Sequence, residues 1–168
     1  LAFAAPILQH LLRDQPHYGD PARESYTRAL ILAPTRELAV QIEDTLVGLT
    51  YHAPCTTAPV FGGVEMGPQE RALKAGVDII VATPGRLMDH MRHDAVDLLR
   101  VQVLVLDEAD RMMDMGFWPD VQRILSALPP ERQTLLFSAT LPGEILRMAT
   151  ERLRSPRFVQ VGQRGAAR

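Results

Sequence analysis

Three carboxylates follow directly on an apolar segment in the second half of this 168-residue chain. The segment Val101–Leu106 is rich in Val and Leu, and it leads into Asp107, Glu108 and Asp110. An almost unbroken apolar run of this length is typical of a strand buried on both faces of a parallel sheet. Ligands of open α/β sheets bind at the carboxyl ends of the strands. The three acids are therefore placed for chemistry, and hard oxygen ligands of this kind suit Mg²⁺ beside a phosphate.

The same acids have a plainer interpretation, because acidic residues also favour the N-terminus of a helix that follows a strand. Three further apolar segments end in polar residues in the same way: Leu30–Ala33 leads into Pro34, Thr35 and Arg36, Val77–Ala82 leads into Thr83, Pro84, Gly85 and Arg86, and Gln133–Phe137 leads into Ser138 and Thr140. Thr35 is also suited to cap a helix that begins there. Four strands that deliver polar side chains to one end of a sheet favour a binding site over helix capping alone.

The rest of the chain alternates between helical and extended patterns, which predicts an α/β fold with a mostly parallel central sheet. The expected helices are Phe3–Arg13, Thr35–Leu49, Pro68–Ala75, Arg86–His93, Val121–Leu128 and one after Pro142. The expected strands are Leu30–Ala33, Thr57–Phe61, Val77–Ala82, Val101–Leu106, Thr134–Phe137 and Phe158–Val161. A polar loop containing Pro16, Gly19 and Pro21 joins the first helix to the first strand.

Five short segments, in this order, resemble the motifs of the DEAD-box ATP-dependent RNA helicases: Pro34–Ala39 (PTRELA), Phe61–Gly63 (FGG), Thr83–Arg86 (TPGR), Asp107–Asp110 (DEAD) and Ser138–Thr140 (SAT). Any one of them is common by chance, but their order and spacing extend the resemblance over nearly the whole chain. The resemblance implies a RecA-like P-loop NTPase fold, a three-layer sandwich around a mostly parallel sheet. Residues 1–162 would then be a partial N-terminal RecA-like lobe, and residues 163–168 would begin the linker to a second lobe.

One element that the resemblance leads us to expect does not occur in the 168 residues. No segment matches GxxxxGK[ST], so the backbone cradle and the lysine that hold the phosphates of ATP have no source in this sequence. The segment Leu1-Ala2-Phe3 is similar to the continuation of the helix that follows this loop in the family. We therefore interpret the chain as an N-terminally truncated lobe of a longer parent, and we expect the fragment alone to be inactive.

The resemblance implies a role for each acidic and hydroxyl side chain at the two last strand ends. Asp107 would hold Mg²⁺ through its water shell, and Glu108 would orient and deprotonate the water that attacks the γ-phosphate of ATP. Asp110 would form hydrogen bonds toward Ser138 and Thr140, and it would couple the nucleotide state to closure of two lobes around RNA. The alternative for Ser138 and Thr140 is a simple cap for the helix that follows them.

Arginines at strand ends are the candidates for contact with RNA. The net charge of −2 argues against a broad electrostatic grip on nucleic acid, so binding would be local. Arg36 and Arg86 stand at strand-to-helix junctions, where a guanidinium and helix N–H groups can together hold a phosphate. The resemblance adds Pro34, Thr35, Gly62, Gly63, Thr83, Pro84 and Gly85 to this set. Such contacts follow the sugar-phosphate backbone and read no base sequence; without the resemblance, a surface ion pair explains each arginine as well.

The remaining features narrow the function. No apolar run approaches the roughly 18 residues of a membrane span, and the lone Cys55 suits a reducing cytoplasm, so we expect a cytoplasmic protein without a membrane partner. His90 and His93 lie three residues apart on an expected helix, and we interpret them as an exposed pair because no third metal ligand has a matching spacing.

Two functions stay open for this chain. It is either part of an RNA-dependent ATPase that unwinds short duplexes or remodels RNA–protein complexes, or a non-catalytic module that clamps RNA or docks protein.

Overall fold

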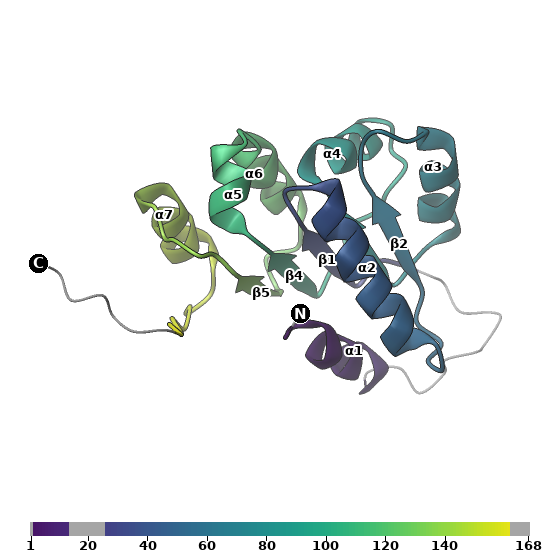
Figure 1. The fold of residues 1–168 in the computed structure, drawn as a ribbon, viewed down its shortest axis with the longest axis horizontal. Coiled ribbons are helices and arrows are strands. Elements are labelled where there is room, and N and C mark those ends of the chain that lie inside the picture. The colour runs from purple at the N-terminus through teal and green to yellow at the C-terminus, as the bar shows by residue number, and fades with distance from the viewer. Residues whose placement is uncertain (1, 14–25, 162–168) are drawn as a thin grey trace, which may run out of the picture.

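The computed structural model, which describes residues 2–13 and 26–161, is built on a five-stranded parallel sheet with the strand order β2-β3-β1-β4-β5 (Figure 1). Its strands are β1 (Ala29–Leu32), β2 (Thr57–Val60), β3 (Ile79–Ala82), β4 (Val103–Leu106) and β5 (Gln133–Leu136). Each strand pairs with its neighbours in parallel and without a register offset along its four residues, so Leu32 lies beside Ala82 on one side and Leu106 on the other. The strand ends are therefore level with one another.

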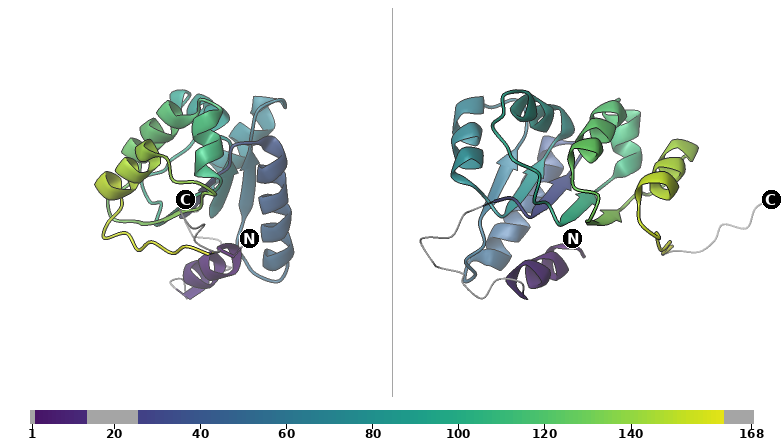
Figure 2. Two further views of the ribbon diagram at one scale, coloured as in Figure 1. Left: turned by 60° about the vertical axis from the view of Figure 1, so that its left-hand side comes forward. Right: turned by 180° about the vertical axis from the view of Figure 1, so that it is seen from behind.

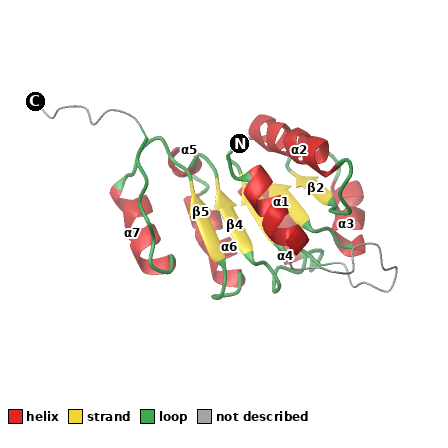
Figure 3. Cartoon of the chain, turned by 90° about the horizontal axis from the view of Figure 1, so that it is seen from below, coloured by secondary structure: helices red, strands yellow, loops and turns green. Residues whose placement is uncertain are grey.

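Helices cover both faces of the sheet, as the views in Figure 2 and Figure 3 show. The helices are α1 (Ala4–Arg13), α2 (Arg36–Thr50), α3 (Met66–Ala75), α4 (Pro84–Arg92), α5 (Ala109–Asp114), α6 (Trp118–Ala127) and α7 (Gly143–Arg152). The buried residues of α1 and α2 pack against one face, and those of α3 to α7 pack against the other. The result is a three-layer α/β sandwich, as predicted. None of these helices has the length and apolar character needed to cross a bilayer within the part of the chain that the structure describes.

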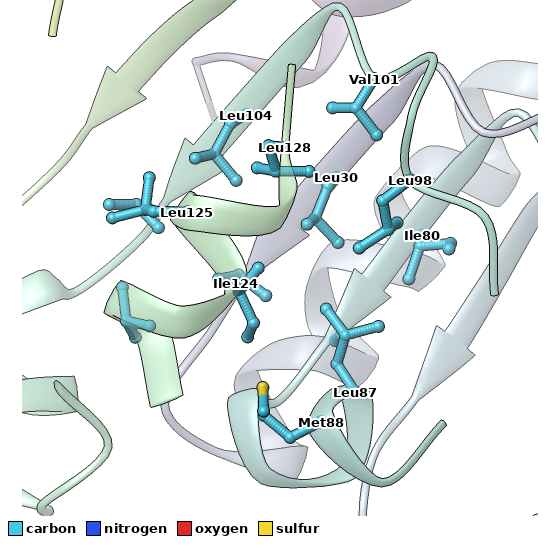
Figure 4. Close-up of a cluster of buried hydrophobic side chains, with 14 of the residues drawn as sticks. Leu30, Ile80, Leu87, Met88, Leu98, Val101, Leu104, Ile124, Leu125 and Leu128 are labelled. Atoms are coloured by element: carbon cyan, nitrogen blue, oxygen red, sulfur yellow. The ribbon is translucent and has the colours of Figure 1, made fainter. Parts of the chain in front are cut away.

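The strands are apolar on both sides because each face of the sheet is covered. Leu30 and Leu32 belong to the cluster under α3 to α7, while Ala29 and Ile31, the alternate residues of the same strand, belong to the cluster under α1 and α2. Figure 4 shows Leu30 among the side chains of the first cluster, which come from neighbouring strands and from α4 and α6. This two-sided burial explains why the central strands lack the polar alternation of a half-exposed strand.

On either side of β1, the helices that follow neighbouring strands cover opposite faces of the sheet. The chain passes from β1 into α2 on one face, whereas β3 and β4, which flank β1, continue into α4 and α5 on the other face. In open parallel sheets, this divergence of the loops marks the place where ligands bind. The topology therefore points to the carboxyl end of the sheet on either side of β1.

Most element boundaries agree with the sequence prediction to within three residues, but the predicted strand Phe158–Val161 is wrong. That segment has no regular structure, and Val161 is 95% exposed. An extended segment becomes a strand only when a neighbour takes up its hydrogen bonds, and the described sheet ends at β5. The helix α5 begins directly after the acids, where their alternative interpretation places the start of a helix. The expected polar loop around Pro16 and the expected linker 163–168 lie outside the described residues.

A buried ion pair joins α1 to the amino end of the sheet. The guanidinium of Arg28, which is 0% exposed, donates to the carbonyl of Leu11 at 2.8 Å and to Asp78 Oδ1 at 3.0 Å. The second carboxylate oxygen of Asp78 accepts hydrogen bonds from the N–H and the hydroxyl of Thr56. The pair fixes the last turn of α1 against β1 and β3, at the end of the sheet opposite to the polar strand ends.

We expect the substitution Arg28→Met to lower the free energy of unfolding by about 3–5 kcal/mol, because it leaves the Asp78 carboxylate buried without its cation. Changing Asp78 to Asn in the same chain should recover part of this loss. Arg92→Met, which breaks an exposed pair with Asp89, serves as the control and should change stability by less than about 0.5 kcal/mol. Denaturant unfolding followed by circular dichroism measures all three; equal effects of the two arginine substitutions would contradict the assignment.

Candidate functional site

The polar segments that follow the five strands lie along one edge of the sheet, at the tips of the arrows in Figure 1. In their order across the sheet they are Phe61–Gly63 after β2, Thr83–Arg86 after β3, Ala33–Arg36 after β1, Asp107–Asp110 after β4 and Ser138–Thr140 after β5. Parallel pairing with level ends brings together segments that are far apart in the sequence. The structure thus collects all of the sequence-predicted site residues on one edge.

An acidic cleft of about 520 Å³ opens at the ends of β4 and β5. It is lined by Asp107, Glu108, Asp110, Arg111, Asp114, Phe137, Ser138 and Ala139. The carboxylate of Asp107 accepts a hydrogen bond of 3.0 Å from the backbone N–H of Glu108. Glu108 itself has a left-handed backbone, with φ 52° and ψ 52°, a conformation that non-glycine residues seldom adopt outside functional sites and turns. Arg111, which sequence reasoning missed, donates to the Glu108 carboxylate at 3.2 Å.

The electrostatics of Asp107 suit a hydrated cation. Burial raises the pKa of this carboxyl above its ordinary value of 3.8, the hydrogen bond from the Glu108 N–H opposes the rise, and the Glu108 carboxylate adds to it. No group of three or more His, Cys, Asp or Glu side chains able to hold a metal occurs within residues 2–13 and 26–161. Mg²⁺ is commonly held by one or two carboxylates together with waters and phosphate oxygens. The donor set therefore fits Mg²⁺ bound through its waters and not a cage made of protein ligands.

Asp110 links the ends of β4 and β5 through a compact set of hydrogen bonds. Its Oδ2 accepts from both the N–H and the hydroxyl of Thr140, each at 2.9 Å, and its backbone N–H donates to Ser138 Oγ at 3.1 Å. Burial alone would raise the pKa of Asp110, but the hydrogen bonds from Thr140, with further ones from Arg111 and Ser138, hold it below its ordinary value. Neither hydroxyl caps α7, because Pro142 stands at the N-cap position of that helix.

A second group of polar residues lies at the ends of β1, β2 and β3. Thr35 caps α2 as predicted, accepting a hydrogen bond from the N–H of Leu38 at 3.2 Å. The exposed Arg36 lies over the ring of Phe61, with its guanidinium carbon 5.1 Å from the ring centroid. Gly63 has a φ of +80°, and a Cβ at this position would lie 3.4 Å from a guanidinium nitrogen of Arg36. A residue other than glycine would be strained here.

Exposure divides the predicted RNA-contacting residues into two kinds. Arg36, Gly62 and Gly63 are exposed, while Thr35, Thr83, Gly85 and Arg86 are half-buried. Pro34 and Pro84 are buried. The accessible polar groups thus come from three neighbouring loops, and they include two arginines.

The interpretation of His90 and His93 as an exposed pair is wrong for His90. His93 is exposed, but His90 is 0% exposed, and its Nε2 lies 3.2 Å from Oε1 of Gln69 on α3. Burial, with the positive charge of Arg86, lowers the pKa of His90 below its ordinary value of 6.5. Helical spacing places residues on the same side of a helix only approximately, and His90 turns toward α3 whereas His93 turns to solvent.

A three-layer sandwich around a parallel sheet, with an acidic strand end beside a hydroxyl-bearing one, defines a RecA-like α/β domain. Residues 1–148 match the family model of the DEAD/DEAH box helicases. The chain belongs to this family. It is 45% identical over 162 residues to DEAD-box ATP-dependent RNA helicase 30 of Arabidopsis thaliana and 41% identical over 160 residues to DEAD-box ATP-dependent RNA helicase CshA of Bacillus subtilis, and these matches cover 96% and 95% of the chain.

Solved structures agree with this assignment. The crystal structure of the yeast DEAD-box splicing factor Prp28 matches 97% of the chain with a TM-score of 0.85 at 35% identity. A DEAD box protein from the hyperthermophile Methanococcus jannaschii matches 79% of the chain with a TM-score of 0.74 at 42% identity. The chain spans 27% and 31% of the two curated relatives and 39% and 36% of the two solved chains.

We expect Asp107→Asn to stabilise the fold. Because the pKa of Asp107 is raised on folding, ionisation costs the folded state stability once the pH exceeds the ordinary value of 3.8, and a neutral amide removes this cost at neutral pH. Asparagine retains the oxygen that accepts the Glu108 N–H. The midpoint of thermal unfolding at pH 7 should rise by roughly 2 °C, measured by scanning calorimetry. Asp114→Asn, an exposed position in the same cleft, should leave the midpoint unchanged; a lower midpoint for Asp107→Asn would refute the assigned cause.

Proposed function

We propose that this chain is the core of the first RecA-like lobe of an ATP-dependent RNA helicase, spanning residues 1–162. In the complete protein, ATP hydrolysis in the acidic cleft would drive local unwinding of short RNA duplexes or remodelling of RNA–protein complexes. The observation that carries the proposal is the position of the acidic cleft and the arginine-bearing loops on one edge of one sheet. The relatives named as ATP-dependent RNA helicases support it.

The nucleotide half of the proposed site is the acidic cleft. Mg²⁺, when bound with ATP, would neutralise charge on the phosphates and orient them. Asp107 would hold the waters of this ion with its carboxylate, one oxygen of which accepts the Glu108 N–H. Glu108 receives the proton of the water that attacks the γ-phosphorus, while ADP departs. Arg111 donates to Oε2 of Glu108 at 3.2 Å, which leaves Oε1 to receive the proton of that water.

The cleft in this chain lacks a phosphate cradle, so we propose that ATP binding requires residues beyond these 168. The pattern GxxxxGK[ST] is absent from the sequence. Asp107 and Glu108 supply only negative charge, which repels a triphosphate in the absence of a cation and of N–H donors. The chain alone is then inactive as an ATPase, and a second RecA-like lobe of the parent would close over the cleft.

The RNA half of the proposed site is formed by the loops after β1, β2 and β3. Arg36 and Arg86 contact phosphates, and the amino ends of α2 and α4 add N–H groups beside Thr35, Thr83 and Gly85. Gly62 and Gly63 allow the sugar-phosphate backbone to approach the loop after β2 closely. These contacts are independent of base sequence. Asp110 would couple the nucleotide state to closure of the two lobes around RNA, because its hydrogen bonds to Ser138 and Thr140 tie the nucleotide cleft to the end of β5.

Substitution Glu108→Gln in the complete protein tests the proposal. The amide keeps the size of the side chain but accepts no proton, so we expect RNA-stimulated ATP turnover to fall at least about 100-fold while ATP still binds. Glu144→Gln, at an exposed position on α7, is the matched control and should retain full turnover. Turnover that is unchanged in Glu108→Gln would contradict catalysis in this cleft, and RNA binding without any turnover in the unmodified protein would favour the alternative of a non-catalytic RNA clamp.

A further inference from the structure

The loops after β2 and β3 are joined by one side chain that belongs to neither of them. Gln69 lies on α3, which packs beside β2 and α4 in Figure 1. Its Nε2 donates to the backbone carbonyl of Phe61 at 3.0 Å, and its Oε1 accepts from Arg86 at 3.3 Å and lies 3.2 Å from Nε2 of His90. A single carboxamide thus contacts the residue before Gly62 and the arginine at the start of α4.

The partners fix the orientation of this carboxamide. The Phe61 carbonyl can only accept a hydrogen bond, so it must face the NH₂ group of Gln69, and the oxygen then faces Arg86 and His90. His90 therefore carries its proton on Nε2, and its buried Nδ1, which has no partner among the described residues, is left as an acceptor. Protonation would place a second N–H in this apolar position beside the Arg86 charge. The lowered pKa of His90 agrees with a neutral ring.

The contacts of Gln69 extend to a third loop through Phe61. The Phe61 ring lies under the guanidinium of Arg36, which also limits the space at Gly63. Because Gln69 donates to the Phe61 carbonyl, it also helps to position the aromatic ring against which Arg36 packs. Gln69 thus contacts Arg86 directly and is linked to Arg36 through Phe61.

We propose that Gln69 is a positioning residue that holds Arg86 directly, and Arg36 through Phe61, in the arrangement that meets the phosphates of RNA. This inference rests on the proposed function, since it presumes that the two arginines contact RNA. Gln69 itself need not touch the ligand. Its effect on RNA affinity must then pass through the arginines, which distinguishes positioning from a general contribution to stability.

A double-mutant cycle on the complete protein tests this inference. The probe is a ten-nucleotide single-stranded oligouridylate, whose affinity is measured by fluorescence anisotropy in the presence of a non-hydrolysable ATP analogue. We expect Gln69→Leu to weaken binding about 10-fold, and to weaken it less than about 2-fold once Arg36 and Arg86 are both already Met. Gln122→Leu, at an exposed position on α6, is the matched control and should change nothing.

The outcomes separate the inference from the function on which it rests. If Arg36→Met and Arg86→Met together weaken RNA binding and Gln69→Leu does not, or if the loss from Gln69→Leu simply adds to theirs, the positioning role is refuted and the proposed function stands. If the unmodified protein binds no RNA, or Arg86→Met has no effect, both the positioning role and the proposed function are refuted.

Should Gln69→Leu fail to fold, His90 supplies a second comparison. His90→Gln retains a donor toward Gln69 and should bind RNA like the unmodified protein, whereas His90→Leu should bind several-fold more weakly. Equal affinities of these two variants would refute the inference.

Discussion

Parallel pairing with level strand ends is the constraint on which the rest of this structure depends. In such a sheet every strand ends at the same edge, so residues separated by up to about a hundred positions in the sequence become neighbours without any further device. Two-sided burial keeps the strands in this register, because a one-residue slip would exchange the side chains of the two clusters above and below the sheet. The site is thus a consequence of how the core packs.

The two ends of the sheet differ in the environment of their charged side chains. At the amino end, the buried pair of Arg28 and Asp78 forms hydrogen bonds to Leu11 and Thr56 and ties α1 to the strands. At the carboxyl end, burial raises the pKa of Asp107, and Glu108 has a left-handed backbone. A partly buried carboxylate of this kind is a cost to folding that a bound cation can offset. The ion pair at one end therefore stabilises the fold, whereas the acids at the other end are placed for chemistry.

Asp110 and Gln69 perform comparable tasks at two places on the same edge. Asp110 joins the ends of β4 and β5 through Ser138 and Thr140, and Gln69 joins the ends of β2 and β3 through Phe61 and Arg86. Each is a polar side chain that bonds to backbone or side-chain groups of a neighbouring loop. Loops at the end of a sheet lack the hydrogen-bond ladder that orders the strands, so cross-loop bonds of this kind are what can make their relative positions definite.

The sequence predicted the sheet and the motif-bearing loops well because both depend on local signals. The unbroken apolar run before Asp107 marks a strand buried on both faces, and Thr35 marks the start of α2. What it did not predict depends on contacts between distant residues. Nothing local in the sequence identifies Asp78 and Arg28 as a buried ion pair. His90 needed the position of α3 to be recognised as buried.

The failed strand at Phe158–Val161 has a similar cause. Its composition is largely apolar and β-branched, but a strand exists only where another strand takes up its hydrogen bonds, and none of the five described strands pairs with this segment. Composition gives the tendency, and pairing with a neighbouring strand decides the outcome. The same limit applies to Glu108, whose left-handed backbone follows from the turn between β4 and α5 and has no signature in residue type.

Hydrogen exchange of the complete protein, measured by mass spectrometry with nucleotide and with RNA added separately, tests most directly whether one sheet edge is the functional surface. The account predicts that an ATP analogue with Mg²⁺ slows exchange at residues 107–111 and 137–140, and that single-stranded RNA slows exchange at residues 35–38, 61–64 and 83–87. Protection confined to the opposite edge, at residues 26–28, 76–78 and 94–102, would contradict it.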